Sequence, residues 1–483
     1  MTATTDYGTS ESIDLASVAP DADAVRRIPR TLALRHDVLS LSSDGNQLTI
    51  ALPDAHDREV IDRVRLVTGM HVRAYRAPRE AIRAKLSAVY PAAEIAALRT
   101  ANLQRTDDAP AIRALDEIHD CAIRSAASDI HVEPTRSGGR VRQRVDGILR
   151  QARVLAPELY AQVITRMKLL AGMDIADRRQ PQDGRYAIER DGRCVDARVS
   201  SMPTILGEKL VVRLLDHQSR IPAIDMLGMP GPLMKRFRRA VHAPHGFVIA
   251  CGPTGSGKTT TLYAAIAERN VESQNLCTIE DPVEVRIPGV AQMQVNARAG
   301  VTFASALRAF LRQDPNVIMV GEMRDEETAA VAASASLSGQ LVLTSLHSND
   351  APSAVERLVE LGVSRHTIAA GLSAIIAQRL VRKVCEACRT PVELSGGVTA
   401  YRANGCPACA GSGYAGRTAL FECIDIDERM RRLIADGASS VALADAARSA
   451  GYEAMYAHGM QRIVRGETTL DELRRVLVVE GAA

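Results

Sequence analysis

The chain has no tryptophan, and aromatic residues make up only 3% of its 483 residues. Surfaces that bind single-stranded nucleic acid stack the bases on aromatic side chains, so this composition argues against such a surface. The formal net charge is only +3, and no overall field therefore attracts nucleic acid or an anionic membrane. Nucleic acid is not an expected partner.

Long apolar segments are also missing. No apolar run approaches the ~18 residues that a membrane-spanning helix requires. The polar and acidic N-terminus, from Met1 to Ser17, excludes a secretory signal peptide. Nine cysteines in such a chain indicate a reducing compartment, so we expect a cytoplasmic protein.

A chain of 483 residues is too long for one hydrophobic core, and its patterns predict several segments. The predicted segments are a disordered tail (1–20), a small docking domain (21–92), a linker (93–109), a middle α+β domain of PAS-like type (110–222) and a third domain (223–483) that includes a zinc module (383–412). In the docking domain, a hairpin is expected around the turn at 43–46, and a helix is expected to end at Gly69.

Strands and helices alternate in the third domain. Apolar segments at Phe247–Cys251, Leu276–Ile279, Val317–Val320 and Leu341–Ser345 predict buried parallel strands. The helical patterns between them predict helices on both faces of the sheet. The fold class is therefore α/β, with a RecA-like P-loop domain that follows two small α+β domains and carries a four-cysteine zinc module. Ligands of such sheets bind at the carboxyl ends of the strands.

The phosphate-binding pattern G-x-x-x-x-G-K-[ST] follows the first of these strands and precedes a helix. It consists of Gly252, Pro253, Thr254, Gly255, Ser256, Gly257, Lys258, Thr259 and Thr260. The glycines let backbone N–H groups close around phosphate oxygens. Lys258 supplies a point charge for the β- and γ-phosphates of ATP, and Thr259 supplies a hydroxyl for Mg²⁺.

Acidic residues follow two of the predicted strands. Glu280 begins the stretch Glu280-Asp-Pro-Val-Glu284, where carboxylates beside a phosphate loop would repel ATP unless a cation or water intervened. Glu322 ends an apolar strand in the manner of a Walker B motif, with Gly321 at the usual position of Asp. Both glutamates are candidates to activate the attacking water. For Glu280 the alternative is a simple helix start, with Pro282 at its first position.

A histidine, His347, follows the fourth predicted strand within Thr344–Asp350. At the end of a buried strand, its ring can sense a γ-phosphate by hydrogen bonding. The alternative is a structural histidine whose ring nitrogens are satisfied inside the protein.

Two C-x-x-C pairs, Cys385/Cys388 and Cys406/Cys409, have the spacing of a tetrahedral four-cysteine zinc site. Four thiolates leave no ligand position open, so the site is expected to be structural. Redox thiols are the alternative.

A row of basic residues lies in the middle domain. Arg140, Arg142 and Arg144 alternate along a predicted strand and therefore share one face. Like charges on one face cost stability unless something anionic meets them, so either an anion binds there or the face is simply solvated.

These elements, in this order, resemble the type II secretion and type IV pilus assembly ATPase family. In the third domain the resemblance rests on the phosphate loop, Glu280–Glu284, Gly321–Asp325, Leu346–Asp350, the cysteine pairs and Gly411–Ala419. In the middle domain it rests on Ala127–Glu133, Arg144–Gly147, Gln182–Arg185, Ala197–Ser200, Gly207–Lys209 and Val212–Leu215. Residues 21–92 are similar to the family's first N-terminal domain.

The resemblance implies a homo-hexameric motor that is peripheral on the cytoplasmic face of the inner membrane. It implies that an inner-membrane secretion platform protein docks on residues 21–92. It also implies that Arg198 and Arg213 reach the nucleotide phosphates from the middle domain. Gly321 agrees with the family's own Walker B motif, whereas Gln340 stands where relatives often carry His, which leaves His347 as the candidate sensor.

Three classes of function remain open from the sequence. The first is an ATPase that drives pseudopilus assembly for type II secretion, favoured over type IV pilus extension because the N-terminal region is short. A retraction motor is disfavoured because those relatives lack the cysteine pairs and the first N-terminal domain. The second class is a P-loop nucleic-acid translocase, and the third is a zinc-organised scaffold that binds ATP without hydrolysing it.

Overall fold

The computed structural model describes residues 12–16, 18–29, 32–33, 36–89, 110–190, 193–215, 221–394 and 397–477. By internal contacts the chain divides into two compact units, Met1–Asp116 and Glu117–Ala483. The predicted linker at 93–109 and, within the predicted tail, residues 1–11 and 17 lie outside the described residues. The boundaries of the predicted domains stay predictions.

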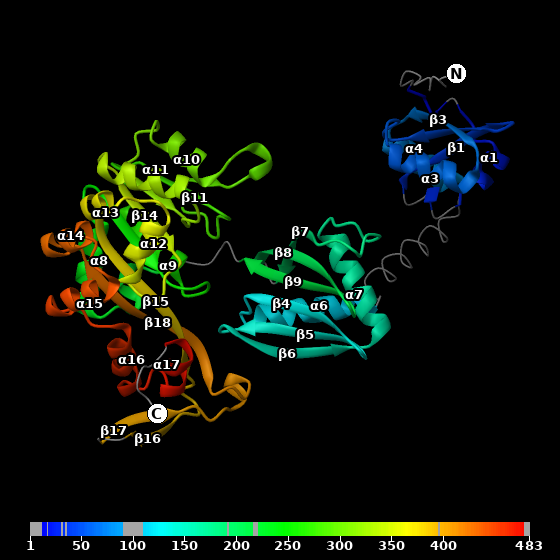
Figure 1. Ribbon diagram of the computed structural model, residues 1–483. Helices are drawn as coiled ribbons and strands as arrows, with labels where there is room; N and C mark the ends of the chain where they lie inside the picture. The colour runs from blue at the N-terminus through cyan, green and yellow to red at the C-terminus, as the bar shows by residue number, and fades with distance from the viewer. Residues whose placement is uncertain are drawn as a thin grey trace. The chain divides into compact units, whose positions relative to one another are not determined.

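The first unit contains a small sheet of order β1-β2-β3, in which β1 and β2 are antiparallel and β2 and β3 are parallel. Its elements are α1 (Ala22–Arg27), β1 (Leu39–Asp44), β2 (Gln47–Leu52), α3 (Arg58–Thr68), β3 (His71–Arg76) and α4 (Arg79–Val89) (Figure 1). The predicted hairpin is confirmed, with Gly45 at φ 53° in its turn.

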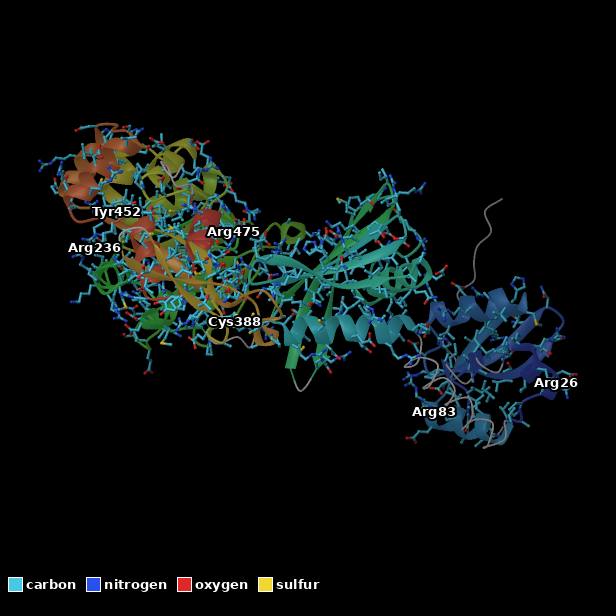
Figure 2. The ribbon with its side chains drawn as sticks, turned by 90° about the horizontal axis from the view of Figure 1, so that it is seen from below. Arg26, Arg83, Arg236, Cys388, Tyr452 and Arg475 are labelled. Carbon is cyan, nitrogen blue, oxygen red and sulfur yellow. The ribbon has the colours of Figure 1, made fainter. Side chains whose placement is uncertain are left out.

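Local signals fix the ends of α3. The Asp57 side chain accepts a hydrogen bond from Val60 N at the helix start, and Gly69 at φ 68° ends the helix as predicted. Residues 13–15 of the predicted tail are packed on this unit instead, because Ile13 N donates to Arg76 O and Leu15 is buried. Arg83 (Figure 2) donates to both carboxylate oxygens of Asp37.

The second unit begins with an antiparallel sheet of order β6-β5-β4-β9-β8-β7. Its strands are β4 (Asp129–Thr135), β5 (Gly138–Val145), β6 (Ile148–Leu155), β7 (Gln182–Arg190), β8 (Arg193–Thr204) and β9 (Gly207–Leu215). Two helices accompany it, α6 (Pro110–Arg124) and α7 (Pro157–Leu170). The sheet and helices give the α+β character that the sequence predicts.

The arginine face of β5 is met by carboxylates of the same sheet. Arg142 Nη2 lies 2.8 Å from Glu133 Oε1, and Arg140 Nη2 lies 3.0 Å from Glu133 Oε2. Lys209 Nζ lies 3.0 Å from Glu133 Oε1. Burial opposes ionisation of Glu133, but hydrogen bonds from Arg142, Lys209 and Arg140 lower its pKa to about 2. Glu133 thus supplies, from within the sheet, an anionic partner that Arg140, Arg142 and Lys209 share.

The larger sheet of the second unit has the order β12-β11-β13-β14-β10-β15-β18, and all its neighbours are parallel except β15 and β18. Its strands are β10 (Gly246–Cys251), β11 (Leu276–Glu280), β12 (Ala291–Gln294), β13 (Val317–Val320), β14 (Leu341–Leu346), β15 (Leu372–Val384) and β18 (Tyr414–Asp425). The four strands predicted from the apolar segments are confirmed.

Helices cover both faces of this sheet (Figure 1). They are α8 (Gly231–Val241), α9 (Lys258–Arg269), α10 (Phe303–Phe310), α11 (Glu326–Leu337), α12 (Ser353–Glu360), α13 (Arg365–Gly371), α14 (Glu428–Ala435), α15 (Ser440–Ser449), α16 (Met455–Val464) and α17 (Leu470–Val476). Alternate residues of β10 enter different cores: Ile249 packs in the cluster with α10 and α11, and Val248 packs in the cluster with α8 and α9. This two-sided burial explains why the strand reads as an unbroken apolar run.

The antiparallel pair β15–β18 extends beyond the parallel strands towards the cysteine pairs. Arg382 pairs with Arg417 and Val384 with Tyr414, next to Cys385. The hairpin of β16 (Thr390–Leu394) and β17 (Val398–Arg402), labelled in Figure 1, lies between the two C-x-x-C pairs in the sequence. No helix in the described ranges has the length and hydropathy of a membrane span.

We expect Glu133→Gln to lower the free energy of unfolding by about 2–3 kcal/mol at pH 7, because three cations lose their shared anion. The folded-state pKa of Glu133 is about 2, below an unfolded value of about 4.3. The stabilisation is therefore present above pH ~4.3 and is lost as the pH falls towards 2. Urea unfolding of the full chain at several pH values measures it. The exposed Glu158→Gln is the control, and an equal loss in both variants would contradict the assignment.

Candidate functional site

The residues predicted to bind phosphate or to take part in catalysis lie at the carboxyl ends of neighbouring parallel strands. The order β11-β13-β14-β10 brings Glu280, Glu322, His347 and the phosphate loop to the same edge of the sheet. Parallel strands place their ends on one side, so residues far apart in the sequence become neighbours. This edge is the candidate site.

The phosphate loop joins β10 to α9. Gly257 has φ 91°, a conformation that glycine adopts readily, and α9 begins at Lys258. The Lys258 ammonium group is nearly buried and donates to Gly252 O at 2.8 Å and to Pro253 O at 3.0 Å. Burial lowers the pKa of Lys258, and the Glu322 carboxylate opposes that effect. The lysine is therefore held over the loop by two carbonyl oxygens that anionic phosphate would replace as partners.

Glu322 lies beside basic side chains at this edge of the sheet. Its carboxylate forms an ion pair with Arg324, and His347 Nε2 lies 3.8 Å from its Oε2. Gly321, at the usual Asp position, accommodates the tight contact with β11: a Cβ atom there would lie 3.3 Å from both Glu280 Cα and Ile279 O. Because Gly321 has no side chain, the chain after β13 can pass close to Glu280, and Glu322 lies near His347.

Glu280 is enclosed by its neighbours. The Tyr263 hydroxyl donates to its Oε2, Thr278 Oγ1 donates to its Oε1 at 2.6 Å, and Gln292 Nε2 donates to the same oxygen at 3.2 Å. Burial raises the pKa of Glu280, and these three bonds oppose the increase. Both carboxylate oxygens have partners. No helix begins at Pro282, since the backbone at 281–290 forms bends and turns.

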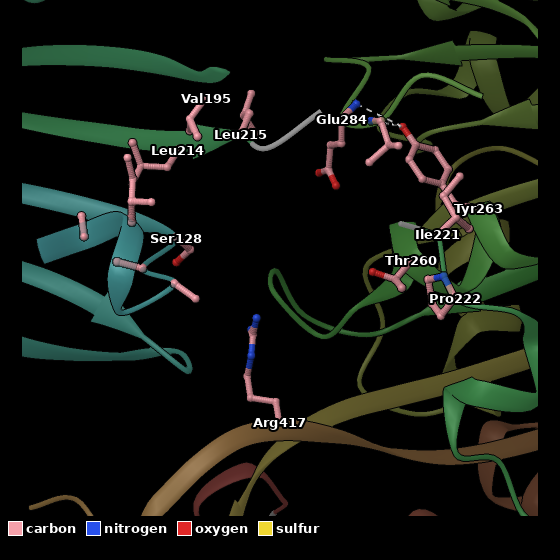
Figure 3. A pocket seen from close by; sticks show the side chains of 15 residues that line it. Ser128, Val195, Leu214, Leu215, Ile221, Pro222, Thr260, Tyr263, Glu284 and Arg417 are labelled. Atoms are coloured by element: carbon pink, nitrogen blue, oxygen red, sulfur yellow. Dashed lines mark hydrogen bonds between the residues drawn. The ribbon is translucent and has the colours of Figure 1, made fainter. Parts of the chain in front are cut away.

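Tyr263 is a site residue that the sequence analysis missed. Its hydroxyl also accepts a hydrogen bond from Glu284 N at 3.0 Å, and Figure 3 shows the ring of Tyr263 reaching from α9 towards Glu284. Thr260, on the same helix, lines a pocket with Tyr263 and Glu284. The signal that could have found Tyr263 is a polar aromatic residue in the second turn of the helix that follows the loop.

His347 follows β14, with about half of its side-chain surface exposed. Partial burial and the charge of Lys258 lower the pKa of His347, and Glu322 acts in the opposite direction. The imidazole is therefore biased towards its neutral form, in which one ring nitrogen donates and the other accepts. The structure brings His347 and Glu322 together.

Arg198 and Arg213 lie directly opposite each other on β8 and β9. Arg213 Nε is 3.4 Å from Asp129 Oδ1, and its side chain is mostly exposed. Desolvation and Glu280 raise the pKa of Glu284, whereas the positive charges of Arg213 and Arg198 lower it. Within the described residues, no hydrogen bond or ion pair that the structure gives joins either arginine to the phosphate loop.

The two C-x-x-C pairs converge. All four Sγ atoms lie within 4.8 Å of one another, and the Cys385–Cys406 and Cys388–Cys409 distances are both 3.9 Å. Tetrahedral zinc–thiolate bonds of about 2.3 Å place sulfur atoms roughly 3.8 Å apart, so the geometry fits zinc. Burial raises the pKa of the Cys409 thiol, but N–H groups of Cys406 and Gly413 outweigh this and lower it to about 6.

Two arginines near the cysteine cluster contact residues outside it. Arg382 pairs with Glu472 and lies over the Tyr414 ring, 3.9 Å from its centroid. Arg389 donates to Gly466 O and lies over the Tyr401 ring. These contacts attach the cysteine cluster to the C-terminal helices.

The fold and the loop geometry define a P-loop phosphate-binding protein. A family model described as "Type II/IV secretion system protein" matches residues 104–475, and a model described as "MshEN domain" matches residues 7–96. The chain therefore belongs to the type II/IV secretion system protein family.

The curated relatives include type II secretion system proteins and type IV pilus assembly ATPases. The type II secretion system protein HxcR of Pseudomonas aeruginosa is 49% identical to this chain, over 77% of the chain and 79% of its own length. The type IV pilus assembly ATPase PilB of Myxococcus xanthus is 36% identical, over 96% of this chain and 88% of its own length.

Among solved structures, the pilus retraction motor PilT with bound ADP is 26% identical, with a TM-score of 0.53 over 75% of this chain and 97% of its own. The Legionella pneumophila ATPase DotB is 22% identical, with a TM-score of 0.57 over 75% of this chain and 94% of its own. The DotB likeness shows the fold alone.

We expect the purified chain to carry one zinc ion, and Cys409→Ser to lose it, because one of four thiolate ligands is removed. Elemental analysis of both proteins measures the metal. The exposed thiol variant Cys194→Ser is the control and should retain zinc. Full zinc content in the Cys409→Ser protein would contradict the site.

Proposed function

We propose that this chain is the ATPase of a type II secretion system, which hydrolyses Mg²⁺-ATP to drive pseudopilus assembly. The observation that carries the proposal is the meeting of Lys258, Glu322 and His347 at one edge of the sheet. Family membership and the 49% identity with HxcR support the secretion assignment. The proposal extends to nine loop residues, Gly252–Thr260, as the nucleotide site.

In the proposed mechanism, ATP phosphates replace Gly252 O and Pro253 O as partners of Lys258. Thr259 would hold Mg²⁺, which neutralises charge on the β- and γ-phosphates when it is bound. Glu322 positions and polarises the attacking water. Glu280 is less suited to that step, because Tyr263, Thr278 and Gln292 already occupy its carboxylate. Its proposed role is to fix the loop at 281–284.

His347 is proposed to sense the γ-phosphate, since its ring contacts Glu322 and is biased towards the neutral form. Arg198 and Arg213 are proposed to stabilise the charge that develops on the phosphates when the middle domain closes. Their electrostatic effect on Glu284 supports a position that faces the site.

The assembly around this site is also proposed. The chain forms a homo-hexamer on the cytoplasmic face of the inner membrane, and residues 21–92 dock on an inner-membrane platform protein. Zinc at Cys385, Cys388, Cys406 and Cys409 is structural. Membership of the type II/IV secretion system protein family supports the proposal that the chain forms an oligomer.

Extension of a type IV pilus is the second candidate. One observation favours it: the match to PilB of Myxococcus xanthus covers 96% of this chain, whereas the match to HxcR covers 77%. The N-terminal region is thus shared with a pilus relative, although the identity with the secretion relative is higher over the shared part.

We expect Glu322→Gln to lower ATP hydrolysis by at least about 100-fold, because the amide cannot polarise water as a carboxylate does. ATP affinity should stay within about threefold, since Lys258 and the loop amides are unchanged. Steady-state phosphate release and nucleotide titration measure the two quantities. Glu327→Gln, at an exposed ion pair with Arg308, is the control. A wild-type chain that binds ATP without measurable hydrolysis would favour the scaffold function instead.

The secretion and pilus functions are distinguished by the platform protein that the chain binds. The full chain, tagged and incubated with inner-membrane extract of its source organism, should recover a type II secretion platform protein. A matched chain without residues 1–92 should recover much less. Recovery of a pilus platform protein would overturn the secretion assignment in favour of the second candidate.

A further inference from the structure

Strand β15 contacts the phosphate loop through residues that have no role in the proposed mechanism. Cys251, the last residue of β10, pairs with Ala377 of β15. Gln378 and Arg379 therefore follow on β15 just where β10 gives way to the loop. Two consecutive side chains of a strand point to opposite faces, so these two residues reach different neighbours.

Gln378 forms the floor of the phosphate loop. Its side chain is buried, and its Nε2 donates to Ser256 O at 2.7 Å. A Cβ atom at Gly252 would lie 2.6 Å from Gln378 O, and one at Gly257 would lie 3.0 Å from Gln378 Nε2. The loop backbone therefore rests on Gln378, both through a hydrogen bond and through direct packing.

Two polar atoms at this floor have no partner among the described residues. They are Ser256 Oγ and Gln378 Oε1, and both are buried. Buried polar groups are usually paired, so their presence beside the loop marks a place where the loop can change its hydrogen bonds. A glutamine whose polar atoms were all hydrogen-bonded would not leave a free acceptor for such a change.

Arg379 reaches the segment His347–Asp350, which we call the sensor loop. Its Nη2 donates to Asn349 O at 2.6 Å, and its Nη1 donates to Gln378 O at 3.1 Å. No ion pair is given for Arg379 within the described residues, and burial lowers its pKa. The rigid fork of the guanidinium group thus joins the strand to the sensor loop through two carbonyl oxygens.

We propose that Gln378 and Arg379 are positioning residues that form a bridge between the phosphate loop and the sensor loop. Gln378 holds the loop in the shape that receives phosphate and so sets nucleotide affinity. Arg379 holds the backbone two residues after His347 and so sets turnover. The inference rests on the proposed nucleotide site at Gly252–Thr260.

The test of Gln378 is Gln378→Met, which keeps the length of the side chain but cannot donate to Ser256 O. Titration of the full chain with a fluorescent ATP analogue should show a Kd raised about tenfold, while kcat changes less than about threefold. The matched control is Gln340→Met: Gln340 also has a buried Oε1 without a partner, but it precedes β14 at the opposite edge of the sheet. Its Kd should match that of the unaltered chain.

A Kd of Gln378→Met within about twofold of the unaltered chain would overturn the role of Gln378. The thermal unfolding of each variant shows whether it is folded. Should Gln378→Met fail to fold, Gln378→Leu also lacks the donor and adds no charge beside the phosphates. It is then held to the same tenfold expectation and the same twofold limit.

The test of Arg379 compares Arg379→Lys with Arg379→Met. Lysine keeps the charge but not the fork that bonds two carbonyls, so both variants should lower kcat by about tenfold. Near-normal turnover in Arg379→Lys would overturn a role in positioning and leave a role for charge alone. Arg236→Lys is the control, because Arg236 also donates to two carbonyls, Ala450 O and Gly451 O, far from the loop in sequence.

Lys258→Ala separates failure of this inference from failure of the proposed site. If Lys258→Ala keeps the affinity of the unaltered chain, nucleotide binds elsewhere and the proposed site is wrong. If Lys258→Ala loses binding while Gln378→Met does not, the site stands and only the bridge is wrong.

Discussion

The burial of β10 on both faces is the constraint on which the rest of the site depends. Every residue of Gly246–Cys251 is buried, and β14 and β15 pair with this strand on either side. The phosphate loop therefore leaves the sheet at a fixed point, between the end of β14 and the middle of β15. Because packed interiors do not deform continuously, a change in the loop must be accommodated by these two neighbours.

The order of the strands also gives the two glutamates different surroundings. Glu280 ends β11, two strands from β14, and is enclosed by Tyr263, Thr278 and Gln292. Glu322 follows β13 by two residues, next to β14, and lies near His347 instead. Strand order, more than residue type, therefore determines which glutamate lies among the cations of the phosphate site. The same order places Gln378 and Arg379 of β15 on the other side of the loop.

Much of this arrangement was predictable from short patterns. The apolar runs predicted β10, β11, β13 and β14, and the loop pattern predicted that a helix follows the loop, as α9 does, because buried strands and glycine turns leave strong local signals. The spacing of the C-x-x-C pairs predicted a four-sulfur cluster that the structure contains. The arginine face of β5 was recognised, but its partner was not, since Glu133 lies on another strand.

Local patterns were enough to predict a phosphate loop followed by polar residues at several strand ends, because each of those signals lies within a few consecutive residues. How those ends are used follows from the tertiary fold. Tyr263 lies 17 positions before Glu280, and Gln378 lies 122 positions after Ser256, yet each pair is hydrogen-bonded. Periodicity reports that a side chain is buried but not which neighbour it meets, since that depends on strand order and on the packing of α9 and β15 around the loop.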